Sequence, residues 1–462
     1  MEQFFHHALR INYDLCFGCT HCMSVCPTEA IRVKNGKAII AGHRCIDCGM
    51  CFKSCPANAF YVEQDDFSTI FNYKHRVILY PSVLTGQLLN EYSAEQIIAA
   101  LYKLGFTHVF EVEHGADFTA QEMQKYQEEN EDVKPLMSSF CPAIVRLIQV
   151  RFPSLVGNLI RRKPPIDIAS MYYRKKLEDQ GIDSKDIGIF YITSCSAKIA
   201  AVKSPVGENS SSVDGIINMK EIYNRIQSTL RADKDIDTSM VEKPQFSSGN
   251  ILWSLTNGEK NHLQGRCLAI DEVNNVIEFL EKLEMGDIDN IDFVELRACD
   301  ESCAGGIFNV ENRFLTVEQM RKRAQSQSDI EAKTPVKNPI YDYADYLSDK
   351  CVLEEIKPRS MVMDEDVGKA IAKLEKSRRM MCYLPGIDCG ACGTPSCSAL
   401  SKDIAQRKAS LSDCVFIHTF MKNSGTLSHE KSLQIVEKTW GVGRIDKDCT
   451  KKGAKNENQN KK

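Results

Sequence analysis

The sequence lacks a strong net charge, an export signal and any long apolar run. Lys and Arg number 58 against 62 Asp and Glu, a net charge of −4, so no field that attracts nucleic acid or an anionic membrane is expected. No apolar run reaches the ~18 residues of a membrane-spanning helix. The first residues, Met1 to His7, have neither a basic start nor an apolar core, which argues against export.

Cysteine, in contrast, is abundant, with 20 among 462 residues. These cysteines are grouped at ligand-like spacings, which favours metal binding in a reducing compartment where thiols are not lost to disulfides. The chain is long enough for two or three domains, each with its own core. We therefore expect a cytoplasmic metalloprotein with no nucleic-acid partner and no membrane span.

The first 72 residues carry one cysteine spacing twice. The pattern Cys-x2-Cys-x2-Cys-x3-Cys-Pro begins at Cys16 and again at Cys45. It is the bacterial two-cluster ferredoxin signature, in which the fourth cysteine ligates the other cluster. A zinc ribbon is the alternative, but zinc needs neither the third cysteine nor the repeated Cys-Pro ending. The expected 4Fe-4S ligands are Cys16, Cys19, Cys22 and Cys55 for one cluster, and Cys45, Cys48, Cys51 and Cys26 for the other.

Alternating strand and helix patterns follow the ferredoxin segment. Buried strands are predicted at 75–80, 109–112, 189–193 and 291–296, and an amphipathic helix at 93–103. This alternation predicts an α/β body with a mainly parallel sheet, where sites gather at the carboxyl ends of strands. Two segments rich in Ser, Asn and Gly, 209–214 and 243–265, are predicted to be loops. Residues 324–350 are expected to form a polar connector.

Three short stretches of this body offer four thiols. Residues 138–142 contain Cys141, residues 193–198 contain Cys195 and Lys198, and residues 295–306 contain Cys299 and Cys303 before a Gly-Gly pair. Four thiolates suit either a tetrahedral zinc ion or a cubane cluster. Lys198 alone is typical of a surface helix, whereas its offset from Cys195 favours a role in the site. The glycine pair fits a turn or a close backbone approach.

The order of these stretches resembles the three signature segments of the iron-only (di-iron) hydrogenases, over roughly residues 73–355. The resemblance implies that Cys141, Cys195, Cys299 and Cys303 hold a 4Fe-4S cluster. It further implies that Cys303 bridges this cluster to a di-iron unit and that Lys198 contacts a cyanide ligand of that unit.

The chain also departs from that family. Phe140 stands where the family has the cysteine that donates protons to the active iron, and Ala201 and Pro164 replace a glutamate and a serine of the same relay. Thr193 and Arg297 stand in place of two methionines that pack around the di-iron unit. A phenyl ring has no exchangeable proton. The resemblance therefore supports the cubane and leaves the di-iron subcluster open.

The C-terminal part carries another cysteine set after a helix predicted from 364 to 380. Cys389, Cys392, Cys397 and Cys414 resemble the small iron-sulfur domain of Rnf-type electron-transfer subunits and corrinoid iron-sulfur proteins, which implies one more 4Fe-4S cluster, with zinc as the alternative. Beyond about residue 440 the polar composition predicts disorder. Four cysteines without partner spacing are interpreted as structural thiols: Cys267, Cys351, Cys382 and Cys449.

The predicted organisation is a ferredoxin domain at 1–72, a hydrogenase-like domain at 73–360, an iron-sulfur domain at 361–425 and a partly disordered tail at 426–462. Three functions stay open. The first is a redox or hydrogen sensor or electron carrier with an impaired relay, working with a partner such as a ferredoxin or a signalling protein. The second is an active hydrogenase that uses Arg297, Asp300 or Glu301 as a substitute relay. The third is a non-catalytic iron-sulfur assembly protein.

Overall fold

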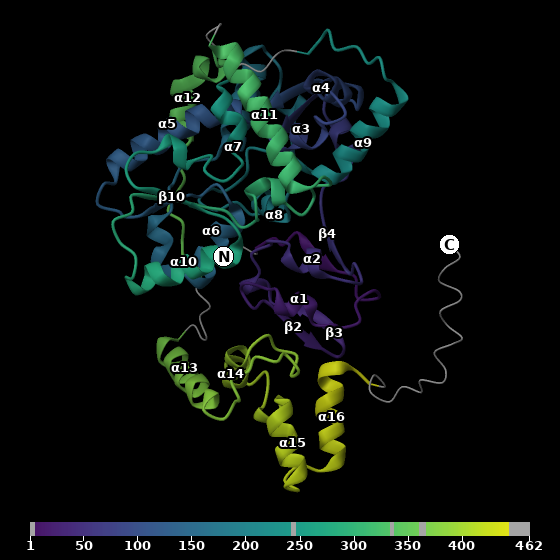
Figure 1. Ribbon diagram of the computed structural model, residues 1–462, viewed down its shortest axis with the longest axis vertical. Coiled ribbons are helices and arrows are strands. Elements are labelled where there is room, and N and C mark those ends of the chain that lie inside the picture. Colours follow the sequence, from purple (N-terminus) through teal and green to yellow (C-terminus); the bar gives the residue numbers. More distant parts are fainter. Residues whose placement is uncertain (1–4, 242–245, 333–336, 360–365, 443–462) are drawn as a thin grey trace. The chain divides into compact units, whose positions relative to one another are not determined.

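The computed structural model describes residues 5–241, 246–332, 337–359 and 366–442. The chain divides into two compact units (Figure 1). The first contains residues 1–10, 46–49 and 62–360, and the second contains 11–45, 50–61 and 361–462. Among the helices of the described ranges, none is long and apolar enough to cross a bilayer.

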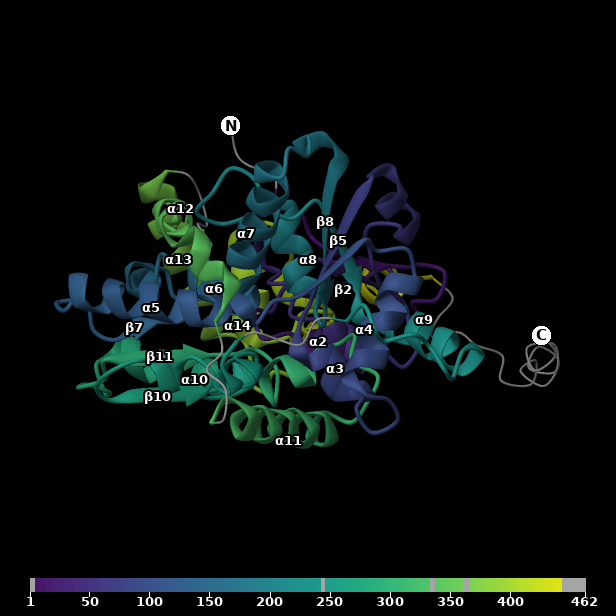
Figure 2. The ribbon, with the colours of Figure 1, turned by 90° about the horizontal axis from the view of Figure 1, so that it is seen from above.

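A four-stranded parallel sheet organises the first unit. Its order is β6-β5-β8-β9, and β5 and β8 lie side by side at its centre (Figure 2). All seven residues of β8 are buried, which explains the uninterrupted apolar pattern of this strand. The prediction of an α/β fold with a mainly parallel sheet is thus confirmed. The strands are β5 (His75–Tyr80), β6 (His108–Glu111), β8 (Ile187–Thr193) and β9 (Gly215–Asn218).

Helices cover this sheet and continue its core. The helix predicted at 93–103 is α4 (Ala94–Lys103), and Ser93 begins it with a capping box to Gln96. Val77, Ile78 and Leu79 of the central strand are fully buried. The other helices around the sheet are α3 (Ser82–Leu88), α5 (His114–Glu129), α6 (Pro142–Arg151), α7 (Pro165–Asp179), α8 (Ser196–Lys203) and α9 (Met219–Ala232).

A second, smaller parallel sheet lies in the same unit. Its order is β10-β11-β7, formed by Cys267–Ile270, Phe293–Leu296 and Leu136–Met137, and α10 (Val273–Met285) connects β10 to β11. The strand predicted at 291–296 is therefore β11. Both β7 and β11 lead directly into cysteine-bearing stretches, so this sheet places two of the three signature segments at its carboxyl edge.

The prediction of a polar connector at 324–350 is wrong. Helix α11 (Arg313–Glu331) runs well into it, and α12 (Ala344–Lys350) occupies its end. Helix α11 buries only Thr316, Val317, Met320 and Ala324, so its apolar stripe is too narrow to stand out in a polar sequence. Arg323 of this helix adds two ion-pair contacts of 2.5 and 2.6 Å to the buried carboxylate of Glu111.

The second unit contains the ferredoxin hairpin. Strands β2 (Ile31–Lys34) and β3 (Lys37–Ile40) pair antiparallel. The turn residues Asn35 and Gly36 have φ values of 51° and 70°, as a type I′ turn requires. Two short helices lie within the cysteine motifs, α1 (His21–Ser24) and α2 (Met50–Ser54). Two short strands lie near the ends of the ferredoxin segment, β1 (Leu9–Ile11) and β4 (Phe60–Val62).

The C-terminal part packs onto this hairpin. The amide of Val33 donates to the carbonyl of Gly393, and the amides of Asn35 and Gly36 donate to the carbonyls of Lys438 and Thr439, each at 2.9 Å. Residues 11–45 and 50–61 of the predicted ferredoxin domain therefore form one compact unit with the C-terminal part. The C-terminal helices are α13 (Val367–Met381), α14 (Cys397–Ala405), α15 (Val415–Asn423) and α16 (His429–Trp440).

Part of the predicted C-terminal tail is ordered, because α16 lies within 426–462. Residues 443–462, including Cys449, lie outside the described residues. The helix predicted to begin at 364 starts at Val367, and Asp366 caps it by accepting a hydrogen bond from the amide of Lys369.

Replacing Gly393 with alanine is expected to lower the apparent melting temperature. The new Cβ would lie 2.3 Å from the carbonyl oxygen of Val33, and the positive φ of 77° adds left-handed strain of about 1–2 kcal/mol. Gly386→Ala is the matched control, because its φ of 69° brings the same strain while nothing lies within 4 Å of the added carbon. Thermal unfolding followed by circular dichroism compares the two. Equal losses would contradict a tight contact between Gly393 and the hairpin.

Candidate iron-sulfur centres

The structure brings together the four cysteines predicted for the first ferredoxin cluster. Burial, and then the neighbouring thiols of Cys19, Cys16 and Cys55, raise the pKa of Cys22 to about 12. Backbone amides also point at two of these sulfurs, from Ala38 to Cys16 at 3.4 Å and from Ala59 to Cys55 at 3.3 Å. Crowded thiols with amide donors fit a cubane, since iron takes the thiolates and the amides stabilise their charge. Their role as ligands stays a prediction.

The second ferredoxin set is divided between the two units. Cys45, Cys51 and Cys26 belong to the second unit, and Cys48 belongs to residues 46–49 of the first. The amide of Ala30 donates to the sulfur of Cys26 at 3.1 Å, as expected for a thiolate ligand. The assignment of this cluster continues to rest on the cysteine spacing.

The C-terminal cysteines also gather. Cys397 and Cys414 are buried in one apolar cluster with Leu400, and Cys392 packs against it. Burial raises the pKa of Cys392; a hydrogen bond from Thr394 opposes this effect, and the thiols of Cys414 and Cys389 add to it. Asp388 fixes the start of α14 by accepting from the amide of Cys397 at 2.6 Å. Four thiols in one small helical segment fit a 4Fe-4S cluster.

In the hydrogenase-like body, Cys141, Cys195 and Cys303 converge. Cys141 precedes α6, Cys195 precedes α8, and Cys303 lies in the short 3-10 helix η7 (Ser302–Gly305). Burial raises the pKa of Cys195 to about 11, an effect that Lys198 opposes and that Cys303 and Cys141 reinforce. Cys299 is half-buried between β11 and η7, and its role as the fourth ligand rests on the Cys-x3-Cys spacing.

The glycine pair after Cys303 serves close backbone approach. A Cβ on Gly306 would lie 2.5 Å from the carbonyl oxygen of Ser194, and one on Gly305 would lie 1.8 Å from that of Asp300. The signature segments around Cys195 and Cys303 can therefore touch only because Gly306 lacks a side chain, and Gly305 allows a close approach within its own segment. In both cases the nearest atom is a backbone carbonyl oxygen.

Two buried cations lie beside the thiols and over the ring of Phe140. The Nζ atom of Lys198 is 3.8 Å from the sulfur of Cys303 and 4.6 Å from the centre of the Phe140 ring. The guanidinium carbon of Arg297 is 4.0 Å from the centre of the same ring. Burial alone would lower the pKa of Lys198, but Cys303, Tyr191 and Cys195 raise it above its ordinary value. Lys198 is thus a cation inside the site, in line with its predicted role.

Arg297 is held by a buried network that the loop prediction missed. Its guanidinium lies 3.0 Å from Glu259 and donates to the carbonyl of Trp253 at 3.2 Å. Burial raises the pKa of Glu259 to about 7, although Arg297 opposes the rise. Ser138 also donates to Glu259 at 2.6 Å. The described part of this segment, 246–265, has no strand or α-helix and only two short 3-10 turns, yet it supplies buried site residues, which no periodic pattern in the sequence could indicate.

The cavity beside Cys303 is small. It has a volume of about 20 Å³, which is the room of roughly one water molecule. Apolar side chains form much of its wall, among them Phe140 and Trp253, together with Glu113, Lys198 and Ser254. The four thiols fit a cubane, but a two-iron unit with its ligands does not fit this cavity unless side chains move. Thr193, in place of a family methionine, is fully buried and bonded to the amide of Cys195.

The three departures from the proton relay line one further cavity. Phe140, Pro164 and Ala201 all contribute to a space of about 100 Å³, which Lys198 also borders. The structure therefore places the three replaced relay positions around one cavity, and none of their present side chains can carry a proton.

The proposed substitutes for that relay lie elsewhere. Arg297 is fully buried in its carboxylate network, Asp300 is exposed and pairs with Arg313 at 2.5 Å, and Glu301 is half-buried. Within the part of the chain that the structure describes, none of the three borders either cavity. Glu113, directly after the strand β6 and Val112, is the acid that the sequence interpretation passed over.

Three segments of the chain match known protein families. Residues 82–258 match the family described as the iron only hydrogenase large subunit, C-terminal domain, a range that holds Cys141 and Cys195 and ends before Cys299. This part of the body is similar to that family. Residues 8–65 match the 4Fe-4S dicluster domain, and residues 384–416 match an Fe-S cluster family. The predicted resemblance of these three segments to iron-only hydrogenases and to 4Fe-4S domains is thereby confirmed.

Individual relatives are distant. Iron hydrogenase 1 from Clostridium pasteurianum is 28% identical over 291 residues, which cover 54% of this chain and 50% of that protein. The chain thus spans about half the length of this relative. A variant of the FeFe-hydrogenase HydA1 from Chlamydomonas reinhardtii is 16% identical, with a TM-score of 0.47, and the match covers 62% of this chain and 94% of that one. At this score the likeness is remote.

Replacing Glu113 with glutamine is expected to make the protein less sensitive to alkaline pH. Burial and then the charge of Glu111 raise the pKa of Glu113 from 4.5 to about 8. The folded state therefore holds a proton that the unfolded state releases, and the stability it contributes is present below pH 4.5 and lost as the pH rises through 8. Between pH 6 and pH 9 the melting temperature should fall further in the wild type than in Glu113→Gln. Parallel pH curves would show that Glu113 keeps an ordinary pKa.

Proposed function

We propose that this protein moves electrons through 4Fe-4S clusters and acts as a redox sensor or electron carrier rather than a hydrogen-converting enzyme. The observation that carries this proposal is the site beside Cys303. Phe140 stands at the relay position under two buried cations, and the adjoining cavity has room for roughly one water molecule. Cluster binding and electron transfer need neither the relay nor the cavity.

The residues divide the tasks of such a site. The thiols of Cys141, Cys195, Cys299 and Cys303 would hold the cubane, which supplies one-electron redox chemistry. Lys198 and Arg297 offset the negative charge of a buried thiolate cluster, and positive charge nearby favours its reduced state. Phe140 and Trp253 are among the side chains that leave room for only about one water molecule beside Cys303.

The number of redox centres in the chain follows from its cysteine sets. Two predicted clusters in the ferredoxin segment, one in the body and one in the C-terminal part give four redox centres. A series of single-electron centres serves to connect a site with an external partner. We propose a separate redox or signalling protein as that partner.

An active hydrogenase is the second candidate. The 3.8 Å contact between Lys198 and Cys303 favours it, because these two residues are the ones that the family resemblance assigns to the di-iron unit. The missing relay and the small cavity speak against it. A non-catalytic assembly protein is the third candidate, and the complete ferredoxin and C-terminal cysteine sets favour a wired electron path instead.

Protein matured anaerobically with the hydrogenase assembly enzymes is expected to show no infrared bands of metal-bound carbonyl or cyanide. It should contain about sixteen iron atoms per chain, from four cubanes. Bands that shift under hydrogen, together with about eighteen iron atoms, would favour the active hydrogenase and overturn the proposal. Iron well below sixteen would contradict the four-cluster count.

Replacing Cys303 with serine is expected to remove one cluster, about four iron atoms per chain, and one reducible signal in electron paramagnetic resonance. Cys382→Ser is the matched control, because Cys382 is exposed and has no assigned role. The control should keep the full iron content and every signal. If Cys303→Ser retains all of its iron, the body does not hold a cubane at this cysteine.

A further inference from the structure

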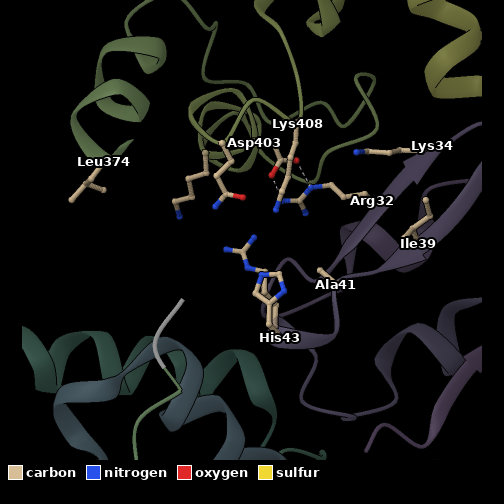
Figure 3. Close-up of a pocket in the computed structure, with 11 residues that line it drawn as sticks. Arg32, Lys34, Ile39, Ala41, His43, Leu374, Asp403 and Lys408 are labelled. Carbon is tan, nitrogen blue, oxygen red and sulfur yellow. Dashed lines mark hydrogen bonds and ion pairs between the residues drawn. The ribbon is translucent and has the colours of Figure 1, made fainter. Parts of the chain in front are cut away.

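A cavity of about 330 Å³ lies within the second unit, and no cysteine is among the residues that line it (Figure 3). The ferredoxin hairpin and the segment after it form one wall with Arg32, Lys34, Ile39 and His43. Helix α13 contributes Leu374, and α14 with the loop that follows contributes Lys402, Asp403 and Lys408. Small-molecule sites have volumes of roughly 300–1,000 Å³, so this cavity suits one compact ligand.

Positive charge dominates the lining. Five permanent cations border the cavity against a single carboxylate, that of Asp403. This carboxylate accepts two hydrogen bonds from Arg32, at 2.8 and 3.3 Å, which offset its charge toward a ligand. The cations are Arg32, Lys34, Arg44, Lys402 and Lys408.

The arginines and the lysines differ in how they are held. Arg32 and Arg44 are buried, and each donates to the carbonyl of Glu29, at 2.7 and 3.4 Å. The two guanidinium groups are therefore held in place at the wall of the cavity. Lys34 and Lys408 make no ion pair with any residue that the structure describes. Two lysines without a counter-charge beside fixed guanidinium groups create a local potential that an anion would lower.

The lining also has an apolar part. Ile39 and Leu374 are 42% and 43% exposed, and they border the cavity together with Ala41. An inorganic ion would leave these side chains uncovered. A ligand with a charged end and a flat apolar body would satisfy both parts.

We propose that this cavity binds a small phosphorylated organic anion, of the nucleoside diphosphate class. Phosphate oxygens suit the lysine ammonium groups and the arginine forks, and the base would cover Ile39 and Leu374. Because the lining comes from both the hairpin and the C-terminal helices, such a ligand would also brace these segments against each other. Binding would therefore stabilise the second unit.

Isothermal titration calorimetry of the full-length protein with ADP tests the proposal. ADP is expected to bind with 1:1 stoichiometry, more weakly as salt rises, and to raise the melting temperature. The double variant Lys34→Ala/Lys408→Ala should weaken binding at least tenfold. Lys422→Ala/Lys431→Ala removes the same charge from exposed positions outside the cavity and should bind as the wild type does.

Further probes separate the contributions. Adenosine should bind at least tenfold more weakly than ADP, because it lacks the phosphates, and inorganic phosphate should also bind more weakly, because it covers no apolar surface. No binding of ADP at millimolar concentration, or equal losses in both double variants, would overturn the proposal. So would binding of an acidic redox protein through Lys34 and Lys408 in the absence of ADP binding, since the occupant would then be a protein.

Discussion

Burying several thiolates in one place requires positive charge close to them, and the hydrogenase-like body is arranged around this requirement. Lys198 and Arg297 are almost completely buried and both lie near Cys303 or its neighbours. Burial would lower the pKa of Arg297, but Glu259, Glu295 and the nearby thiols raise it. Arg297 thus stays charged because the carboxylates of Glu259 and Glu295 stabilise its positive charge. The thiols, the cations and the carboxylates depend on one another.

The same network explains why distant segments meet. Glu295 of β11 accepts hydrogen bonds from the amides of Asn257, Glu259 and Lys260, at 3.0 to 3.1 Å. It therefore shapes the irregular segment that brings Trp253 to the cavity. The amide of Cys303 donates to the carbonyl of Ser254 at 3.1 Å, so the same segment also fixes a predicted ligand. The wall of the site and its cysteine are positioned by one loop.

Sequence patterns predicted the regular parts of this fold. The uninterrupted apolar run of β8 and the Asn35-Gly36 turn each have one structural solution, so both were predictable. The buried side of α11 was not, since its few apolar residues are scattered among charges. The cavity bordered by Trp253 and Phe140 was also beyond prediction, because irregular backbone carries no period and these two residues are more than a hundred positions apart.

The contacts between the hairpin and the C-terminal part bear on how the module could have been assembled. A ferredoxin is commonly regarded as a cassette that can be moved between proteins. Here the side chain of Arg32 is buried against Asp403, and Glu29 accepts a 2.5 Å hydrogen bond from Ser396. A fragment of residues 1–72 would leave that arginine without its carboxylate and expose backbone amides that helix α16 now satisfies. The ferredoxin hairpin and the C-terminal part therefore depend on each other for these contacts, and a protein engineered to carry one of them would need the other as well.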